Sequence, residues 1–419
     1  MDSTEAVESS EDPDQQRGAS PQRGAVAPGV RANEAVGEGP LFSRAFVALL
    51  GMQAAYGFSF SLFFLLPKYL AALGESPSRI GLVMGGFGVA CISTIPFLPM
   101  LLAKVGRRGA LVFATLLLSF ASAAFALLPL PGVMAIPLRA AEGVTWTIMF
   151  STAMALTAEM APRSRLAQAI GIAGAASLIM NAIAPAIGEP LADHFGYRSV
   201  FALATLSSLV ASALAWRLPV GNAAPREHEP VLRSAEGGGA LLAPPSRSRV
   251  PLYLVFSVAG LGYGVLSTFL APYALAKGIH AIRTFFIAYT FSALCVRVLG
   301  GRLSDRLGHA SVASWAVLAY GLVVASTGAL APYHLAVLGF VFGLAHGAAF
   351  PALMALLVGG TSPHQRPRVL GIANGSMSLG MASVYPAGLL VSRLGYPAMF
   401  AVAGALTAAA SFLLRESRK

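Results

Sequence analysis

Charged residues are scarce in this 419-residue sequence, at 11% of the total. A soluble domain carries about 25%, so this chain would have too little polar surface to stay in water. The net charge of +11 does not indicate nucleic-acid binding, because the basic residues occur singly or in small clusters between apolar runs and form no phosphate-binding face. The scarcity of charge predicts a membrane protein with no nucleic-acid partner.

Cysteine is almost absent as well: Cys91 and Cys295 are the only two, and both lie inside apolar runs. This argues against a disulfide framework and predicts two small buried hydrophobic side chains. The sequence contains no Cys/His cluster with metal-ligand spacing, no HExxH or GxSxG motif and no Walker A pattern. We therefore predict no metal site, no cofactor, no enzymatic activity and no use of ATP within this chain.

Apolar sequence is what the chain has in abundance: 56% of its residues are hydrophobic and the mean hydropathy is +0.69. Several runs are long enough to cross a hydrocarbon core of about 30 Å. Twelve runs are candidate transmembrane helices: 45–66, 79–101, 110–129, 133–157, 166–188, 199–218, 251–272, 282–300, 311–330, 334–358, 369–391 and 397–414. The predicted fold is an all-α membrane protein with twelve transmembrane helices.

Two polar segments divide the chain. Residues 1–41 lack hydrophobic periodicity and are predicted to be a disordered tail, without the apolar core of a cleaved signal peptide. Residues 219–250 form the one long internal connection, with charged residues among Gly and Pro. We predict that this connection is a cytoplasmic linker between two six-helix bundles, 42–218 and 251–415.

Lysine and arginine in the connections predict the orientation. With the N-terminus inside, eighteen of them flank the spans on the cytoplasmic side and six on the other side. The six are Lys68, Arg79, Arg198, Lys277, Arg283 and Arg393. Under the positive-inside rule both termini are therefore cytoplasmic. The richness in Ala, Gly and Arg suggests a bacterial plasma membrane, that is, the inner membrane.

The two predicted bundles share sequence. The segment GVTWTIMFSTAMAL at 143–156 corresponds to GLAHGAAFPALMAL at 343–356, with Gly, Phe and Met-Ala-Leu in register at a shift of 200. Likewise GIA at 171–173 returns as GIA at 371–373. A parallel repeat of two six-helix, pseudo-symmetric halves is expected of several classes of secondary transporter.

A charged turn bounded by glycines separates the eighth and ninth candidate spans, reading GRLSDRLGH at 301–309. Gly301 and Gly308 allow the backbone to turn sharply. Asp305 can accept hydrogen bonds from a helix N-terminus or from an arginine. The predicted partners of Asp305 are Arg297 and Arg306.

The corresponding turn of the first half is degenerate. Gly106 and Arg107, followed by Arg108, keep the last glycine and the basic pair, but Ala103 stands where the acidic residue belongs. Any charge network on this face should therefore be asymmetric and centred on Asp305.

These motifs carry a family resemblance. The pattern G-x-L-x-D-R-x-G at 301–308 closely resembles a signature of major facilitator superfamily transporters, with His309 in place of the final basic residue. RAAEG at 139–143 resembles the family's R-x-x-x-G motif, and APAIG at 184–188 resembles a weakened antiporter G-P-x-x-G motif. The resemblance spans residues 42–415. It implies halves that rock about a midplane site, a cytoplasmic latch at 301–308, an arginine associated with proton coupling, and a slight preference for export.

Two charged residues lie within the fourth span. Arg139 and Glu142 are three residues apart, hence on one helix face, and Glu142 is about 14 Å deep at 1.5 Å per residue. A charge at this depth costs roughly 2.5–3.5 kcal/mol on insertion scales, so it should face a wet cavity or a partner. Either Glu142 carries the coupled proton with Arg139 tuning it, or the two form a permanent structural ion pair.

Another ionisable residue is placed at similar depth. His346 lies near the centre of the tenth span and has a side chain that titrates near neutral pH, so it is either a substrate or proton contact or a satisfied core residue. Glu189, at the outer end of the fifth span, is predicted to lie at the membrane interface.

Five uncharged polar residues are predicted to line the cavity or to form interhelical hydrogen bonds: Gln53, Tyr56, Asn181, Tyr263 and Asn374. With one acid and few bases among the candidates, the set favours a neutral or cationic ligand.

The predicted function is that of a monomeric, proton-coupled exporter of a drug-like compound or small metabolite. Its partners would be that small-molecule substrate, protons and the lipid bilayer. An uptake symporter is one alternative. A non-transporting membrane receptor or assembly factor on the same scaffold is another.

Overall fold

The computed structural model describes residues 41–128, 132–219, 249–299, 306–359, 361–362 and 365–416. Within these ranges the chain is helical and contains no β-strand. The helices are α1 (Arg44–Leu62), α2 (Leu66–Ala72), α3 (Pro77–Thr94), α4 (Leu98–Leu127), α5 (Ala135–Met160), α6 (Leu166–Phe195), α7 (Tyr197–Trp216), α10 (Val250–Ala276), α11 (Arg283–Leu299), α13 (His309–Ser326), α14 (His334–Val358), α15 (Arg366–Ala382) and α16 (Val384–Glu416). Nearly all of the predicted tail and linker lies outside the described residues.

The helix starts follow local sequence signals. The Ser43 hydroxyl accepts a hydrogen bond from the Phe46 N–H (3.2 Å) at the start of α1, and Ser76 accepts one from the Arg79 N–H (3.3 Å) at the start of α3. Each serine satisfies an N–H group that has no partner inside the helix. Gly196, at φ 78°, separates α6 from α7, a backbone conformation that favours glycine.

Eight helical stretches of the described chain are long and apolar enough to cross a membrane. Two of them, Pro77–Leu127 with 51 residues and Arg368–Leu414 with 47, each cover two predicted spans. Gly106 (φ 69°) interrupts the helical backbone inside α4, and Gly395 (φ 82°) does so inside α16. The predicted spans 79–101 and 110–129 leave a connection at 102–109. In the structure these residues are helical except at Gly106, which makes the turn alone. Twelve spans remain a prediction.

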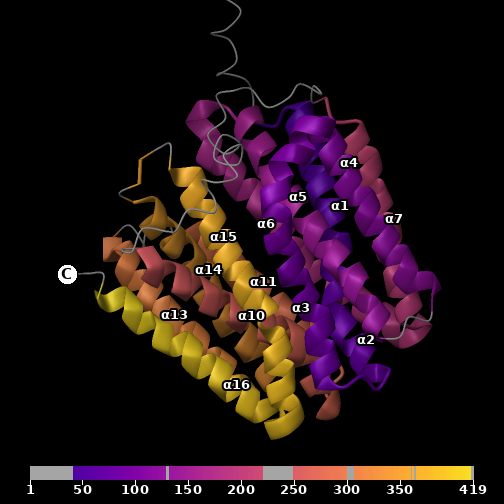
Figure 1. Ribbon diagram of the computed structural model, residues 1–419, viewed down its shortest axis with the longest axis vertical. Coiled ribbons are helices and arrows are strands. Elements are labelled where there is room, and N and C mark those ends of the chain that lie inside the picture. Colours follow the sequence, from indigo (N-terminus) through magenta and orange to yellow (C-terminus); the bar gives the residue numbers. More distant parts are fainter. Residues whose placement is uncertain are drawn as a thin grey trace, which may run out of the picture.

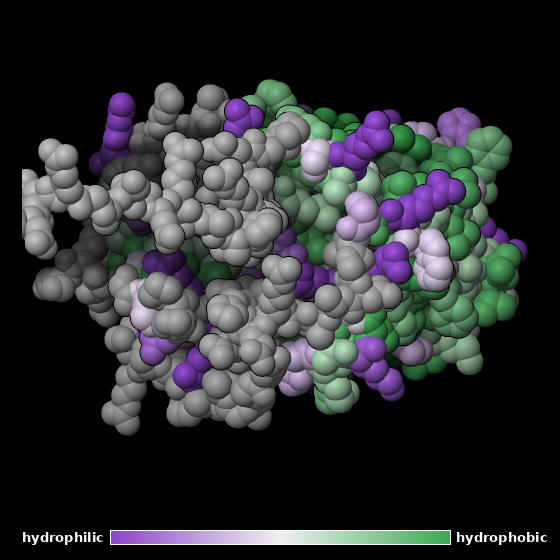
Figure 2. All heavy atoms as spheres, turned by 90° about the horizontal axis from the view of Figure 1, so that it is seen from above, coloured by the Kyte–Doolittle hydropathy of each residue, from purple (hydrophilic) through white to green (hydrophobic). Residues whose placement is uncertain are grey.

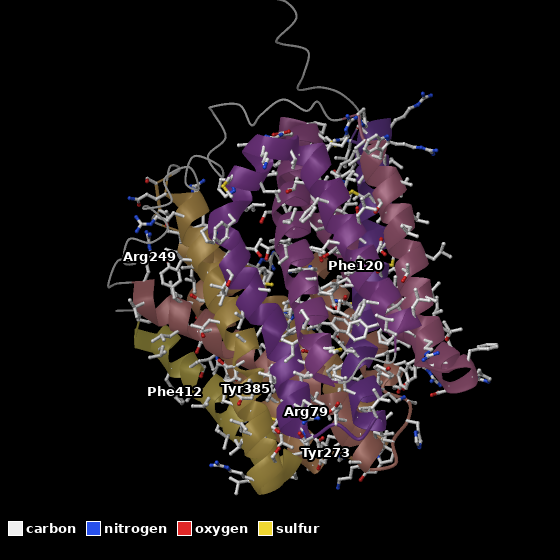
Figure 3. The ribbon with its side chains drawn as sticks, turned by 45° about the vertical axis from the view of Figure 1, so that its right-hand side comes forward. Arg79, Phe120, Arg249, Tyr273, Tyr385 and Phe412 are labelled. Atoms are coloured by element: carbon white, nitrogen blue, oxygen red, sulfur yellow. The ribbon has the colours of Figure 1, made fainter. Side chains whose placement is uncertain are left out.

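The outer surface is suited to lipid. On α4 the large exposed side chains Phe113, Leu116 and Phe120 follow a spacing of three and four residues, which places them on one face. Phe120 is 67% exposed and is one of the side chains labelled in Figure 3. Figure 2 looks down on one end of the molecule, and its coloured part shows hydrophobic residues with several hydrophilic side chains among them. The chain is a multi-pass membrane protein.

The helices form two groups with the same internal packing. Figure 1 shows α1 and α4–α7 on one side of the molecule and α10 and α13–α16 on the other. In the first group α1 packs on α6 and α7, α3 on α5, and α4 on α5 and α7. In the second, α10 packs on α15 and α16, α11 on α14, and α13 on α14 and α16. The two sets of contacts correspond helix for helix.

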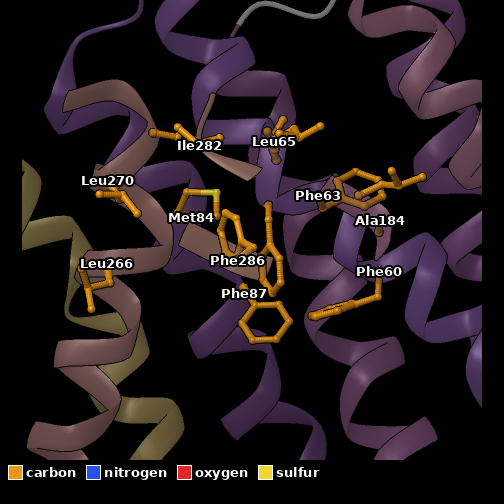
Figure 4. Close-up of a cluster of buried hydrophobic side chains, with 14 of the residues drawn as sticks. Phe60, Phe63, Leu65, Met84, Phe87, Ala184, Leu266, Leu270, Ile282 and Phe286 are labelled. Carbon is orange, nitrogen blue, oxygen red and sulfur yellow. The ribbon is translucent and has the colours of Figure 1, made fainter. Parts of the chain in front are cut away.

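Contacts between the groups run mainly through α3 against α15 and α16, and through α6 against α11. Gly88 of α3 allows one of these close approaches, because a Cβ atom there would lie 2.5 Å from Ala382 N and 2.6 Å from Ser378 O. Figure 4 shows one hydrophobic cluster to which both groups contribute, including Met84 from α3 and Phe286 from α11. The site described next lies between these contacts.

Candidate functional site

A cavity of about 360 Å³ lies between the two helix groups. Both groups line it, chiefly through α1, α3, α5 and α6 on one side and α10, α11, α14 and α15 on the other. Most of the predicted site residues contribute to its wall: Gln53, Tyr56, Arg139, Asn181, Tyr263, His346 and Asn374. These positions lie far apart in the sequence and meet because the helices are packed in this order.

Glu142 lies behind the cavity wall. Its side chain is 0% exposed and forms an ion pair with Arg139, which does line the cavity. The Arg139 guanidinium also lies over the Phe87 ring, 4.7 Å from its centroid. One Glu142 oxygen, Oε1, is buried with no hydrogen-bond partner in the described chain. A carboxylate with one unsatisfied oxygen at such depth has a free position at which to take up a proton.

His346 sits among aromatic rings. Its Nδ1 is 3.2 Å from the Tyr289 hydroxyl, and its ring stacks near those of Tyr263 (5.5 Å between centroids) and Phe342 (5.8 Å). Its Nε2 is buried and lacks a partner in the described chain. The imidazole is therefore held by one hydrogen bond and by packing, and its second nitrogen is buried without a hydrogen-bond partner in the described chain.

The polar groups on the α1 side are partly satisfied. Ser61 donates a hydrogen bond to Asn181 Oδ1 at 2.8 Å, and the Tyr56 hydroxyl is 3.0 Å from the Thr145 hydroxyl. Gln53 is buried, and its Nε2 has no hydrogen-bond partner among the described residues. Buried polar groups are normally hydrogen-bonded, so the Gln53 amide is an exception in the wall of this cavity.

One end of the cavity is closed by two layers of side chains. The inner layer is a stacked pair of rings, Phe64 from the first group and Phe286 from the second, 5.0 Å apart with an interplanar angle of 3°. The outer layer is a buried ion pair, in which Lys68 Nζ on α2 is 2.6 Å from Glu189 Oε1 on α6. Lys68 is 3% exposed and Glu189 0%.

Glu189 also binds the second helix group directly. It accepts hydrogen bonds from the backbone N–H groups of Ile282 (3.1 Å) and Arg283 (2.9 Å), at the start of α11. The favourable site for an anion at a helix N-terminus explains this contact. Lys68 in turn donates to the carbonyl of His280 at 2.8 Å. The ion pair therefore joins the two groups across the cavity end.

The predicted gating residues fall in different places. Gly301 and Asp305 lie outside the described residues. Gly308, at φ 82°, precedes α13, and Arg306 is exposed next to it. Gly106 is the kink in α4, and Arg107 forms an ion pair with Glu159 of α5. Arg297, predicted to pair with Asp305, lies on the cavity wall.

Sequence reasoning missed the Lys68–Glu189 contact. In the sequence analysis Lys68 contributes only to the predicted orientation, and Glu189 is predicted to lie at the membrane interface. A signal was present: each is a lone charge beside a proline, at the same end of an otherwise apolar span. Pairing opposite charges at equal depth would have found it. In the described chain, no group of His, Cys, Asp and Glu side chains is placed to hold a metal ion.

An all-helical body with membrane-length apolar helices, in two similar groups around a central cavity, is an architecture typical of secondary transporters. The chain belongs to the Major Facilitator Superfamily, whose model matches residues 47–326 and 252–419. This finding agrees with the resemblance carried by the turn at 301–308.

Curated relatives include drug-resistance proteins. Multidrug resistance protein MdtG of Serratia proteamaculans is 27% identical over 258 residues, which cover 60% of this chain and 62% of that protein. MdtG of Salmonella arizonae is 24% identical over 258 residues, covering 60% and 63%. The chain thus matches less than two thirds of the length of these relatives.

Solved structures share the fold. A mutant of the peptide transporter POT superimposes with a TM-score of 0.76 at 14% identity, covering 91% of this chain and 96% of that one. A mutant of the nucleoside transporter NupG superimposes with a TM-score of 0.72 at 12% identity, covering 89% and 100%. At such identities the likeness shows the fold alone.

Proposed function

We propose that this protein is a secondary transporter that exports a drug-like compound or small metabolite in exchange for protons. The observation that carries the proposal is a central cavity closed at one end by side chains from both helix groups. Alternating access requires a site between two halves and a closure that breaks when the halves rock. The Phe64–Phe286 stack and the Lys68–Glu189 pair meet that requirement.

The proposed architecture has twelve spans in two six-helix halves, with both termini cytoplasmic in the plasma membrane. The matching helix contacts of the two groups support the halves. The turns at Gly106 and Gly395 support counting two spans in each of the long stretches. In this orientation the Lys68–Glu189 closure faces away from the cytoplasm, so the structure corresponds to a state closed on the outer side. The protein would act as a monomer.

The proposed proton carrier is Glu142. It is buried, paired with Arg139 and has one oxygen without a hydrogen-bond partner in the described chain. Proton uptake would release Arg139 from its ion pair, and Arg139 faces the cavity. A ligand in the cavity and the proton on Glu142 would therefore act on the same guanidinium.

The export direction rests on the relatives. The names of the MdtG proteins support a drug-like substrate and efflux. Proton-coupled uptake is the second candidate, and a receptor or assembly factor on the same scaffold is the third. The cavity, with polar atoms available in its wall, favours transport over the third.

Flux in reconstituted vesicles tests the proposal. Compounds from a drug and metabolite panel that raise the melting temperature of the purified protein would be followed across vesicles with an imposed pH gradient. We expect movement opposite to the proton flow. Movement with the protons would establish uptake instead, and no gradient-driven movement of any stabilising compound would overturn transport.

A further inference from the structure

The cavity wall carries an excess of positive charge. Two arginines line it, Arg139 and Arg297, and among the described lining residues there is no Asp or Glu. Arg139 is neutralised by its ion pair with Glu142. Arg297 forms no ion pair with any carboxylate of the described chain. The sequence predicted a neutral or cationic ligand because it assigned Arg297 to the cytoplasmic turn. Since Arg297 lines the cavity instead, the net charge of the cavity wall is positive.

Arg297 is placed to meet a ligand. It stands about two turns beyond Tyr289 on α11, and both side chains line the cavity. Its Nη1 atom lies 3.6 Å from where a Cβ on Gly174 would be, so the guanidinium reaches the α6 wall of the other half. The C-terminus of α11 offsets about half of an elementary charge, so it compensates the guanidinium only in part.

The rest of the wall is aromatic and flexible. Phe60 and Trp146 stack at 4.8 Å between centroids on one side, and Tyr263 stacks with His346 on the other. Four methionines also line the cavity: Met149, Met154, Met377 and Met381. Aromatic faces bind flat rings, and methionine adapts to irregular shapes. A guanidinium recognises planar carboxylates through two parallel hydrogen bonds.

We propose that the cavity binds an aromatic organic anion, with its carboxylate or equivalent acidic group on Arg297 and its ring system between the aromatic walls. This inference rests on the proposed function, because it names the substrate class of the same cavity. Gln53 and His346 also line the cavity, and each carries one buried nitrogen that has no hydrogen-bond partner in the described chain.

Three probes of similar shape test the proposal: 2-naphthoate, 2-naphthamide and 2-naphthylmethylammonium. Binding to the purified full-length protein in neutral detergent would be measured by titration calorimetry. We expect 2-naphthoate to bind about tenfold or more tightly than the amide, since a hydrogen-bonded charge contact is worth about 1.5–3 kcal/mol. The ammonium should bind more weakly than either.

Arg297→Gln should abolish the preference for the carboxylate, and Arg297→Lys should keep part of it, because lysine retains the charge without the planar fork. Arg198→Gln, at an exposed arginine in the first turn of α7, is the matched control and should behave like wild type. Unliganded melting curves show whether each variant folds, and the Lys variant keeps the test valid if the Gln variant does not.

Equal or tighter binding of the amide or ammonium, no binding of any probe, or an unchanged carboxylate preference in Arg297→Gln would each overturn the proposal. Displacement of 2-naphthoate by phosphatidylglycerol would place a lipid headgroup at Arg297 and would overturn it too. Carboxylate-selective binding without gradient-driven flux would instead refute the proposed transport while leaving this inference standing.

Discussion

At the residue scale, the Arg139–Glu142 pair shows how one helix presents a charge to a cavity without exposing it. Glu142 is fully buried, and Arg139 occupies the wall in front of it. An ion pair between residues three apart forms within a single helix turn, so it needs no particular packing of neighbouring helices. With this geometry Glu142 would carry the proton, and a change in its charge would reach the cavity through Arg139.

Glu142→Gln should abolish gradient-driven flux and spare substrate exchange, because the amide keeps the shape of the side chain and cannot take up a proton at neutral pH. The measurement compares counterflow with uphill flux in vesicles. Asp193→Asn, at an exposed acid near the end of α6, is the control and should retain both. Normal uphill flux in Glu142→Gln would remove Glu142 from the coupling mechanism.

The closed end depends on a second buried pair. In Glu189→Gln the Lys68 ammonium loses its buried partner while the end is closed. Opening of this end would expose the ammonium to water, so the penalty falls on the closed state. Breaking a buried ion pair costs about 3–5 kcal/mol, so the closed state should lose population strongly. In a protein whose own cysteines are replaced by serine, a Ser61→Cys probe, which lines the cavity without belonging to either closing layer, should react at least about tenfold faster with an impermeant maleimide added on the side of the closed end.

Glu75→Gln serves as the comparison, because it breaks the partly exposed Glu75–Arg79 pair (2.9 Å) near the start of α3. That change should leave the labelling rate near wild type, as exposed pairs contribute little. If Glu189→Gln also leaves the rate unchanged, the ion pair is structural and does not hold the end closed.

The site was predictable from the sequence where a polar residue interrupts an apolar run. Arg139, His346 and Asn374 are conspicuous for that reason, and the structure brings all three to one cavity. The place of Arg297 on the cavity wall was not predictable, because its position near a charged turn suggests a partner there. Which way a side chain points at a helix end depends on the packing of α11 against α6, and no local pattern contains that information.

At the scale of the elements, the apolar runs indicated the helices well, and glycines decided their breaks. Gly395 lies within the connection 392–396 between two predicted spans, and it interrupts the helical backbone there. The first span differs: it has a 3-10 turn at Phe63–Leu65 and continues as α2 to Ala72. Pro67 at the start of α2 explains this, since proline is tolerated in a first helical turn. A hydropathy pattern alone does not predict a 3-10 turn inside an apolar run.

Gly88→Val should destabilise the contact between α3 and α15. The added Cβ would meet the backbone of Ala382 at 2.5 Å and of Ser378 at 2.6 Å, which neither side-chain motion nor a rotamer change can relieve. Overpacking of this kind costs about 1–3 kcal/mol, so the melting temperature should fall.

Gly171→Ala is the matched change on α6, where an added Cβ has no neighbour within 4 Å. There we expect an unchanged or slightly higher melting temperature, because alanine loses less backbone entropy than glycine in a helix. Equal effects of the two substitutions would show that close approach at Gly88 is not needed.

At the scale of the whole molecule, the charges at the helix ends predict the orientation in the membrane. Arg249, before α10, and Arg79, at the start of α3, lie toward opposite ends of the helical body (Figure 3). In a variant lacking the native cysteines, Lys277→Cys should react with an impermeant maleimide in intact cells, and Arg249→Cys only after permeabilisation. The reverse pattern would invert the orientation.

The repeated helix contacts were foreshadowed by the shift of 200 residues between the halves, while the cavity shape was not. Sequence similarity between 143–156 and 343–356 marks equivalent helices, α5 and α14. It says nothing of how far apart the two halves stand, which depends on contacts such as Gly88 against Ala382 and Phe64 against Phe286.

The two buried ion pairs differ in how they respond to rocking. Arg139 and Glu142 belong to the same helix, α5, so a rigid-body rocking of the halves would leave their backbone spacing unchanged. Lys68 and Glu189 share one half, but their ammonium and carboxylate also hold the main chain of the other half at His280, Ile282 and Arg283. Opening on this side would break these contacts between the halves. The rate of opening would then depend on the Lys68–Glu189 pair, and the number of protons carried would depend on Glu142. A substitution at one pair could therefore change one of these properties without changing the other.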